Sequence, residues 1–485
     1  MRHLALLLLA QALFFAQTIP EGIDAILKSS TNGQCGFWGI HIVSLGSGGT
    51  LFAFQPDSLF VPASTAKLFT TALALERLGA DYRFVTSVAA SRGPDAAGTV
   101  TGDLHLVGTG DPTLSARPVP YRKGAALRSP LWALEELADE IVARGVRRVE
   151  GDVVGDDRAY VWEPHPEGRA QEDALWDYGA PVSALSINDN RFSLILRPGR
   201  RAGDPAGVRV LPTLEYFLIE NRVLTTRTGE SKIEVERLPG SRQVRVWGSL
   251  PLKAAPVGLS LAVDDPAEYA AAALYDALER RGVAIAGKPI ARHRYAGDDS
   301  EWRDQDVELA RRVSPPLREI LEVIDKESPN LYAELVLREV ARVRQGAGSQ
   351  KAGLEEMRSF LREAGIPEEE ARLADGSGLS TLNLVTPRAV TKLLAFMQSS
   401  KEREDWMGLL AAGGEDGTLS QRFAGVGAGR IRAKTGTLTH VSALAGYARA
   451  SGGDTRAFCI VVNNYASPAS EIRAIIDRMV LLLIQ

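Results

Sequence analysis

The sequence predicts a mixed α/β protein with several domains, in which the two ends of the chain share one sheet. Strand-like segments lie near both ends, each beside a helix-like segment. A helical region precedes the C-terminal strands, and a long stretch punctuated by glycine and proline separates the two halves. The chain has 485 residues, and single cores stop growing beyond about 250–300 residues. The length therefore also favours several domains.

The composition is that of a globular protein. Apolar residues make up 45% and charged residues 24% of the chain, and the formal net charge is -4. These values exclude a wholly disordered chain, a collagen-like repeat and a nucleic-acid-binding footprint. Only 11 of the 56 basic residues are lysines. Lysine can lose its proton in a suitable environment, whereas arginine cannot.

The N-terminus has the pattern of a secretory signal. Met1-Arg2-His3 is a short basic start, and an apolar run extends from Leu4 to about Phe15. The run is shorter than the ~20 residues of a membrane-spanning helix. We expect residues 1–19 to be a signal peptide and the mature protein to be secreted across the cytoplasmic membrane, into the periplasm or another extracytoplasmic space.

The N-terminal half of the sheet follows this signal. Residues 21–28 predict a helix, and residues 35–43 and 50–54 predict two strands joined by a glycine-rich turn. Pro62-Ala63-Ser64 then predicts the start of a helix that ends at Gly79.

The C-terminal third supplies the matching pieces. Residues 314–400 are mostly helical in pattern. The helices expected there include 316–326 and 331–344, and they are followed by strands at 430–438, 442–450 and 455–463 and by a last helix at 468–483. Five strands from the two ends of the chain thus predict one sheet covered by terminal helices.

Residues 87–299, called the insertion below, have a different pattern. Short alternating segments at 233–235 and 244–246 flank a Pro-Gly turn and predict a β-hairpin. One helical stretch, 266–282, ends the region. We expect one or two extra domains here. The cysteines, Cys35 and Cys459, either form a single bridge or remain two buried thiols.

The chemistry centres on a serine and a lysine. The sequence contains no G-x-S-x-G elbow, H-E-x-x-H motif, P-loop or G-x-G-x-x-G motif, and its six histidines are scattered. Ser64-Thr65-Ala66-Lys67 is the only S-x-x-K. On a helix this spacing places both side chains on one face. A lysine with a lowered pKa can then activate the serine hydroxyl. Alone, the motif more often reflects a helix cap beside a solvated lysine.

Two further motifs complete a candidate site. Lys434-Thr435-Gly436-Thr437 lies on an expected strand, where a lysine and hydroxyls can bind a substrate carboxylate. Gly436 allows close approach to the strand backbone. Three S-x-N motifs occur, at Ser30/Asn32, Ser186/Asn188 and Ser328/Asn330. Chain order, and the break between two helices at Ser328, favour the third motif, although Ser328 also fits a simple helix N-cap.

Taken together, the three motifs in this order resemble the penicillin-recognising serine enzymes. Further segments resemble the class C low-molecular-mass penicillin-binding proteins, the D-alanyl-D-alanine carboxypeptidase/endopeptidase family, over essentially the whole mature chain. They are Pro62-Ala63, Gly102-Asp103-Leu104 through Gly110-Asp111-Pro112-Thr113-Leu114, Asp375-Gly376-Ser377-Gly378-Leu379-Ser380, Gly414-Glu415-Asp416-Gly417-Thr418-Leu419 and Ala443-Leu444-Ala445-Gly446-Tyr447. Pro329 and His440 depart from the residues expected at their positions.

The resemblance implies a fold and a domain plan. A penicillin-binding, transpeptidase-like domain is expected to contain a five-stranded antiparallel sheet flanked by helices, plus an all-helical subdomain, and to carry inserted β-rich domains. Residues 20–86 and 300–485 would form this discontinuous catalytic domain. Residues 87–155 and 251–299 would form inserted domain II, and residues 156–250 a nested domain III.

The resemblance also implies residue roles. Ser64 would be the nucleophile, Lys67 the general base and Ser328 a proton relay, all three catalytic. Asn330, Lys434, Thr435, Gly436 and Thr437 would bind substrate, and the backbone N–H groups of Ser64 and Thr437 would form the oxyanion hole.

The expected activity is that of a serine D-alanyl-D-alanine carboxypeptidase and DD-endopeptidase. Its partners would be peptidoglycan peptides, with β-lactam antibiotics as covalent inhibitors, and neither nucleic acid nor any cofactor or metal is expected. The sequence leaves peripheral association with a membrane or wall, and the oligomeric state, open. Two alternatives are a β-lactamase or esterase of the same superfamily and a non-catalytic penicillin-binding sensor. Intact Ser64 and Lys67 disfavour the sensor.

Overall fold

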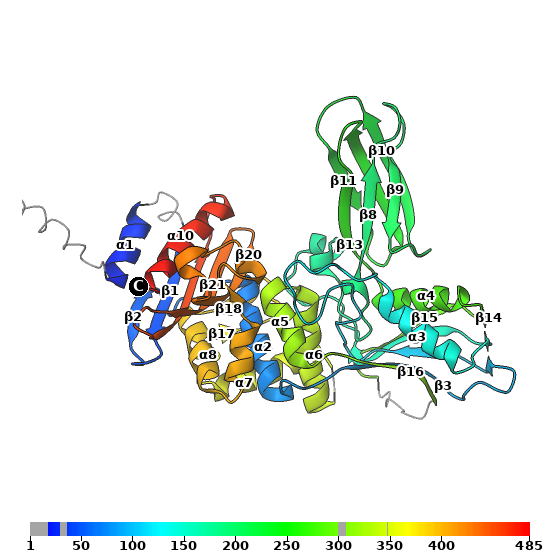
Figure 1. Cartoon of the computed structure of the whole chain (residues 1–485), viewed down its shortest axis with the longest axis horizontal. Coiled ribbons are helices and arrows are strands. Elements are labelled where there is room, and N and C mark those ends of the chain that lie inside the picture. Colours follow the sequence, from blue (N-terminus) through cyan, green and yellow to red (C-terminus); the bar gives the residue numbers. More distant parts are fainter. Residues whose placement is uncertain (1–17, 30–35, 299–306, 347) are drawn as a thin grey trace, which may run out of the picture.

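The computed structural model describes residues 18–29, 36–298, 307–346 and 348–485. The molecule is elongated, with a sheet at one end, a group of helices in the middle and the insertion at the other end (Figure 1). Nearly all of the expected signal peptide, Cys35 and the motif at Ser30/Asn32 lie outside the described residues.

The main sheet combines the two ends of the chain, as predicted. Its order is β19-β20-β21-β22-β1-β2, and every neighbouring pair is antiparallel. The strands are β1 (Phe37–Ser44), β2 (Thr50–Phe54), β19 (Ala411–Ala412), β20 (Ile431–Leu438), β21 (Val441–Arg449) and β22 (Thr455–Asn463). The five expected strands are confirmed. The sixth, β19, has two residues, too few to produce a recognisable alternation in the sequence.

Both faces of this sheet are buried by helices. The terminal helices α1 (Ile19–Ser29) and α10 (Ala469–Leu482) pack on one face around a common apolar core. The helical region covers the other face, and a second core joins the two layers. The helical region comprises α2 (Lys67–Leu78), α5 (Leu317–Glu327), α6 (Asn330–Gln345), α7 (Gln350–Glu363), α8 (Pro387–Ser399) and α9 (Arg403–Leu409). It also contains the short strands β17 (Ala371–Arg372) and β18 (Leu384–Val385).

Cys459 lies in the core between the sheet and these helices. Its thiol is free and buried, and burial raises its pKa to about 12. For this cysteine the structure therefore shows the buried-thiol alternative.

One part of the insertion forms most of a five-stranded sheet with the order β15-β7-β5-β3-β16. This sheet extends beyond residues 87–299 at both ends, because β3 begins at Val85 and β16 follows the insertion. The strands are β3 (Val85–Ala90), β5 (Leu104–Val107), β7 (Val153–Val161), β15 (Pro289–Arg294) and β16 (Val307–Val313), and a small sheet of β4 (Thr99–Val100), β6 (Arg148–Val149) and β14 (Ala284–Ile285) lies beside it. Helix α4 (Pro266–Glu279) agrees with the prediction, but α3 (Trp132–Ala143) was not predicted. Its buried Leu134, Leu137 and Ile141 carry the helical period.

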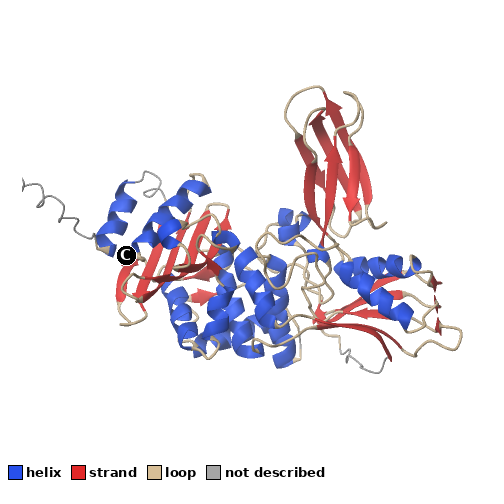
Figure 2. Cartoon of the chain, in the orientation of Figure 1, coloured by secondary structure: helices blue, strands red, loops and turns tan. Residues whose placement is uncertain are grey.

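The other part of the insertion projects from the molecule and contains strands and loops (Figure 2). It holds two three-stranded sheets, β13-β8-β9 and β10-β12-β11. The strands are β8 (Arg191–Arg197), β9 (Gly207–Leu211), β10 (Leu218–Thr226), β11 (Lys232–Glu236), β12 (Gln243–Pro251) and β13 (Val257–Ala262). Antiparallel pairing of β11 with β12 confirms the predicted hairpin.

A loop between β7 and β8, residues 162–190, runs back from the insertion to the helical region. The Gly168 carbonyl accepts a hydrogen bond of 3.0 Å from the backbone N–H of Thr381. The Tyr178 carbonyl accepts one of 2.9 Å from Asn330 Nδ2. The insertion thus contributes a wall to the site described next.

Candidate active site

Ser64 lies in a 3-10 turn, Ala63–Ala66, directly before α2. The sequence predicted that this residue opens an α-helix. Instead, Ala63 has a positive φ of 49°, and the backbone N–H and Oγ1 of Thr65 both donate to the Pro62 carbonyl, at 3.3 and 2.7 Å. This turn leaves Ser64 only partly buried, at the opening of a cleft.

Lys67 is fully buried below the serine. Its Nζ donates to Ser64 Oγ at 2.9 Å, to Asn330 Oδ1 at 2.7 Å and to the Ser377 carbonyl at 2.6 Å. Three acceptors therefore match the three N–H donors of an ammonium group. Burial, and next the positive charge of Lys434, lower the pKa of Lys67 well below its usual value. The pairing of Ser64 with Lys67 that the S-x-x-K motif suggested is present.

Ser328 occupies the break between α5 and α6 in the left-handed conformation, with φ 66° and ψ 33°. Its Oγ accepts a hydrogen bond of 2.8 Å from Lys434 Nζ. The N-cap position of α6 belongs to Pro329, so Ser328 is not the simple N-cap that was the alternative. A non-glycine residue in this conformation costs about 1–2 kcal/mol, and such strain is typical of functional sites.

Lys434 projects from β20 and is fully buried. Burial lowers its pKa, and the buried carboxylate of Asp325 on α5 opposes that effect. The pKa of Asp325 is in turn raised by burial. Asp325 Oδ2 accepts a hydrogen bond of 3.1 Å from Thr71. A buried acidic group thus interacts electrostatically with both lysines.

The remaining residues of the third motif have different surroundings. Thr437 is exposed and lines the cleft. The Thr435 hydroxyl donates to Thr418 Oγ1 at 3.0 Å. A Cβ on Gly436 would lie 2.7 Å from the Pro62 carbonyl oxygen. The close approach of the turn that carries Ser64 therefore requires glycine at this position.

The cleft beside Ser64 has a volume of about 630 Å³. Its walls come from the segments that carry the three motifs, the loop after β17, the insertion, and the adjoining ends of β21 and β22. The lining residues include Ser64, Asn330, Thr437, Leu379, Asp173 and Tyr178. Ser186 of the rejected S-x-N motif is buried in the insertion, where its hydroxyl donates to the Ser183 carbonyl.

Sequence reasoning missed the charged groups that surround the lysines. They are Asp325, Glu334 on α6, and Arg169 of the insertion. A fourth charged group, Asp375, was named only as part of a segment that resembles the family. Each has at most 5% of its side chain exposed. A single buried charge has no characteristic spacing, so the sequence carries no signal for it.

Two kinds of feature are absent from the described residues. No cluster of three or more His, Cys, Asp or Glu side chains there is arranged to hold a metal ion. No helix in that part of the chain is long and apolar enough to span a membrane.

Comparison with known proteins now decides the family. Residues 21–485 match the D-Ala-D-Ala carboxypeptidase 3 (S13) family. The chain belongs to this family. Membership confirms the resemblance seen in the motifs and makes the protein a serine-type D-alanyl-D-alanine carboxypeptidase, a hydrolase.

Individual relatives are also carboxypeptidases. A D-alanyl-D-alanine carboxypeptidase of Actinomadura sp. (strain R39) is 36% identical over 464 residues, covering 93% of this chain and 82% of the relative. The carboxypeptidase DacB of Haemophilus influenzae is 27% identical over 421 residues, covering 85% and 82%.

Solved structures confirm the fold. Penicillin binding protein 4 (dacB) from Haemophilus influenzae has a TM-score of 0.81 at 25% identity, covering 94% of this chain and 97% of that one. The same protein complexed with a novel beta-lactam has a TM-score of 0.79 at 24% identity, covering 96% and 99%.

Proposed function

We propose that Ser64 is the nucleophile of this carboxypeptidase and that Lys67 is its general base. The observation that carries the proposal is the set of contacts around Lys67 Nζ. A neutral amine keeps two N–H donors, and these satisfy Asn330 Oδ1 and the Ser377 carbonyl. The remaining lone pair then faces Ser64 Oγ at 2.9 Å. The lowered pKa of Lys67 favours this neutral form.

The reaction is acyl transfer in two steps. Ser64 Oγ attacks the carbonyl carbon between two terminal D-alanines, and its proton passes to Lys67. The C–N bond breaks when the leaving amine receives the proton that Lys67 took up, relayed by Ser328, whose Oγ accepts a hydrogen bond from Lys434. Water then hydrolyses the ester on Ser64, releasing the shortened peptide and restoring the hydroxyl.

Substrate binding uses the other motif residues. Lys434, with the hydroxyls of Thr435 and Thr437, would bind the terminal carboxylate. Asn330 would hold the peptide amide, exchanging its hydrogen bond to the Tyr178 carbonyl for one to substrate. The backbone N–H groups of Ser64 and Thr437 would stabilise the oxyanion, at about 3–4 kcal/mol per donor in other enzymes.

The substrates we propose are the stem peptides of peptidoglycan and their cross-links. Cleavage of a cross-link proceeds through the same acyl-enzyme, because only the leaving amine differs; DD-endopeptidase activity is thus a second outcome of one site. β-Lactams would acylate Ser64 covalently, and the likeness in fold to the β-lactam complex supports this. An extracytoplasmic location fits both these substrates and the basic, apolar N-terminus.

One experiment separates this proposal from the two alternatives. The wild-type protein and Ser64→Ala are incubated with labelled penicillin, with a peptide ending in D-Ala-D-Ala and with a cross-linked peptide dimer. The proposal predicts a long-lived label, D-alanine release and dimer cleavage, all lost in Ser64→Ala. Rapid loss of the label would instead indicate a β-lactamase, and labelling without D-alanine release a sensor. Labelling and cleavage by Ser64→Ala would overturn the site.

A further inference from the structure

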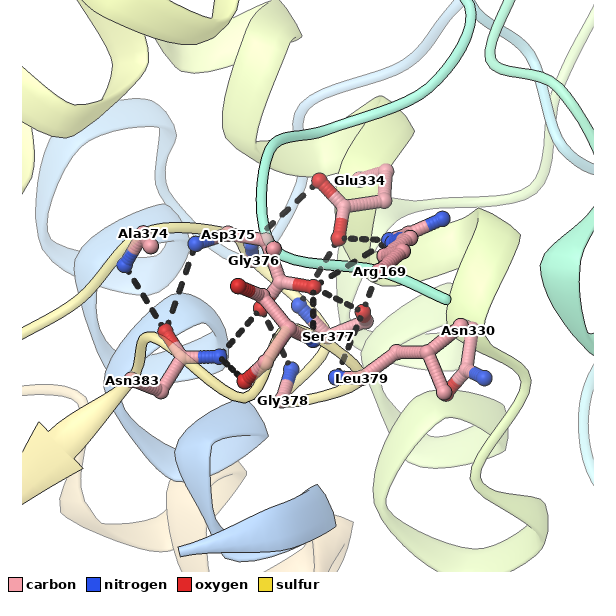
Figure 3. Close-up of polar contacts among 12 residues, drawn as sticks. Arg169, Asn330, Glu334, Ala374, Asp375, Gly376, Ser377, Gly378, Leu379 and Asn383 are labelled. Atoms are coloured by element: carbon pink, nitrogen blue, oxygen red, sulfur yellow. Dashed lines mark hydrogen bonds and ion pairs between the residues drawn. The ribbon is translucent and has the colours of Figure 1, made fainter. Parts of the chain in front are cut away.

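Arg169 links the insertion to the base of the candidate site. It lies in the loop after β7, and its side chain is 5% exposed. Its Nη2 lies 2.6 Å from Glu334 Oε1, 3.2 Å from Asp375 Oδ2 and 3.0 Å from Ser377 Oγ. Figure 3 shows this arginine above the turn that contains Asp375 and Ser377, beside Glu334 of α6.

The same groups fix the backbone of Ser377, whose carbonyl accepts a hydrogen bond from Lys67. The Ser377 N–H donates to Glu334 Oε1 at 3.0 Å, and its hydroxyl donates to Asp375 Oδ2 at 2.9 Å. The Ser377 carbonyl then receives the 2.6 Å bond from Lys67 Nζ. An unbroken chain of contacts thus leads from the insertion to the amine that would activate Ser64.

We propose that Arg169 is a positioning residue for acylation, which the insertion supplies to hold the Ser377 turn against Lys67 and to offset the two buried carboxylates there. This inference rests on the proposed role of Lys67 as the base. Without Arg169, Glu334 and Asp375 would favour a charged ammonium on Lys67, and a charged amine has no lone pair for the Ser64 proton.

The charges that face Lys67 come from five parts of the chain, and their effects have opposite signs. Lys434 and Arg169 lower its pKa, whereas Asp375 and Glu334 raise it. Asp325 on α5 is also coupled electrostatically to Lys67. The uncharged hydrogen-bond partners of Lys67 Nζ are Ser64, Asn330 and Ser377. Removal of Arg169 therefore raises the pKa of Lys67 even though the other charges stay in place.

The test is the pH dependence of acylation by labelled penicillin, measured as a second-order rate constant from pH 5 to 9.5. The acidic limb of this pH–rate profile is the range in which the rate constant falls as Lys67 becomes protonated. Arg169→Met should move this limb to higher pH by about one unit, and the rate constant near neutral pH should fall about tenfold. Arg169→Lys, which keeps the charge, should restore the wild-type limb. Glu334→Gln removes a negative charge and should move the limb downward.

Arg342→Met is the control, because it removes an arginine of α6 that pairs with Glu339 on the same helix, away from the site. Its limb should coincide with that of the wild type. An unshifted limb in Arg169→Met, or a rate that falls equally at every pH, would overturn the inference. If Arg169→Met fails to fold, Glu334→Gln provides the test. An acidic limb in Glu334→Gln that stays in place or moves to higher pH would contradict the inference.

Mass mapping of the penicillin adduct keeps the two proposals apart. An adduct on Ser64 with unshifted limbs contradicts only the role of Arg169. An adduct on another residue of the wild-type protein contradicts the proposed function itself.

Discussion

Lys434 Nζ donates a 2.8 Å hydrogen bond to Ser328 Oγ, joining strand β20 to the break between α5 and α6. The two residues are 106 positions apart in the chain. Ser328 holds this position with a left-handed backbone that most residues avoid. The hydroxyl is thus presented to the lysine by a conformation that a helix would not provide.

Replacing Ser328 should separate stability from activity. Ser328→Gly and Ser328→Ala both remove the hydroxyl, so both should lower kcat for D-alanine release by at least about tenfold. Glycine tolerates the φ of 66°, whereas alanine does not, so the glycine variant should be more stable by about 1 kcal/mol. Thermal unfolding and steady-state kinetics test both parts. Equal stability of the two variants, or wild-type kcat, would contradict this assignment.

The two site lysines should respond differently to arginine. Lys67→Arg retains a charge but supplies no neutral amine, so acylation should fall at least about 100-fold near neutral pH. Lys434→Arg should be milder, because only charge and donors are required there. Penicillin acylation rates of the two variants provide the comparison. Near-wild-type acylation by Lys67→Arg would defeat the role of Lys67 as base.

Asp325→Asn should move the pH profile of kcat/KM downward. The Asp325 carboxylate favours the charged forms of both lysines, so a neutral residue there lowers both pKa values further. Lys67 then becomes a free base at lower pH, and Lys434 loses its charge at lower pH. The acidic and the basic limb of the profile should both move to lower pH by about one unit. A D-Ala-D-Ala peptide serves as the substrate for this measurement. A profile that stays in place, or moves upward, would show that Asp325 does not act on these lysines.

Gly436→Ala should disturb the turn that carries Ser64. The added Cβ would lie 2.7 Å from the Pro62 carbonyl oxygen and 3.1 Å from the Thr65 nitrogen. Overpacking of this kind costs about 1–3 kcal/mol, and we expect acylation to fall with it. Gly452→Ala is the control, since its Cβ would meet no atom within 4 Å. Thermal unfolding that does not distinguish the two variants would contradict the account.

The parts of the site that follow from residue spacing could be predicted from the sequence. The S-x-x-K spacing indicated the contact between Lys67 and Ser64. The break between two helices selected Ser328 over Ser186, which precedes a strand-like run inside the insertion. Arg169 could not be found in this way, because its partners lie 165 to 208 residues away and the loop that carries it has no periodic pattern. Asp325 was hidden on the buried face of α5, where apolar residues are expected.

The fold shows the same limit. The five strands of the main sheet have clear alternation or turns at their ends, whereas β19 is too short to give a pattern. Helix α3 was overlooked because its period lies inside a region dominated by turns and strands. The limits of the inserted domains, at 87–155, 156–250 and 251–299, stay a prediction.

The most direct test of the central claim is peptide mapping of the protein after reaction with penicillin. The account predicts one adduct, on the peptide containing Ser64, and none in Ser64→Ala, with unchanged thermal unfolding as the control for folding. An adduct on any other serine, or an adduct that persists in Ser64→Ala, would contradict it.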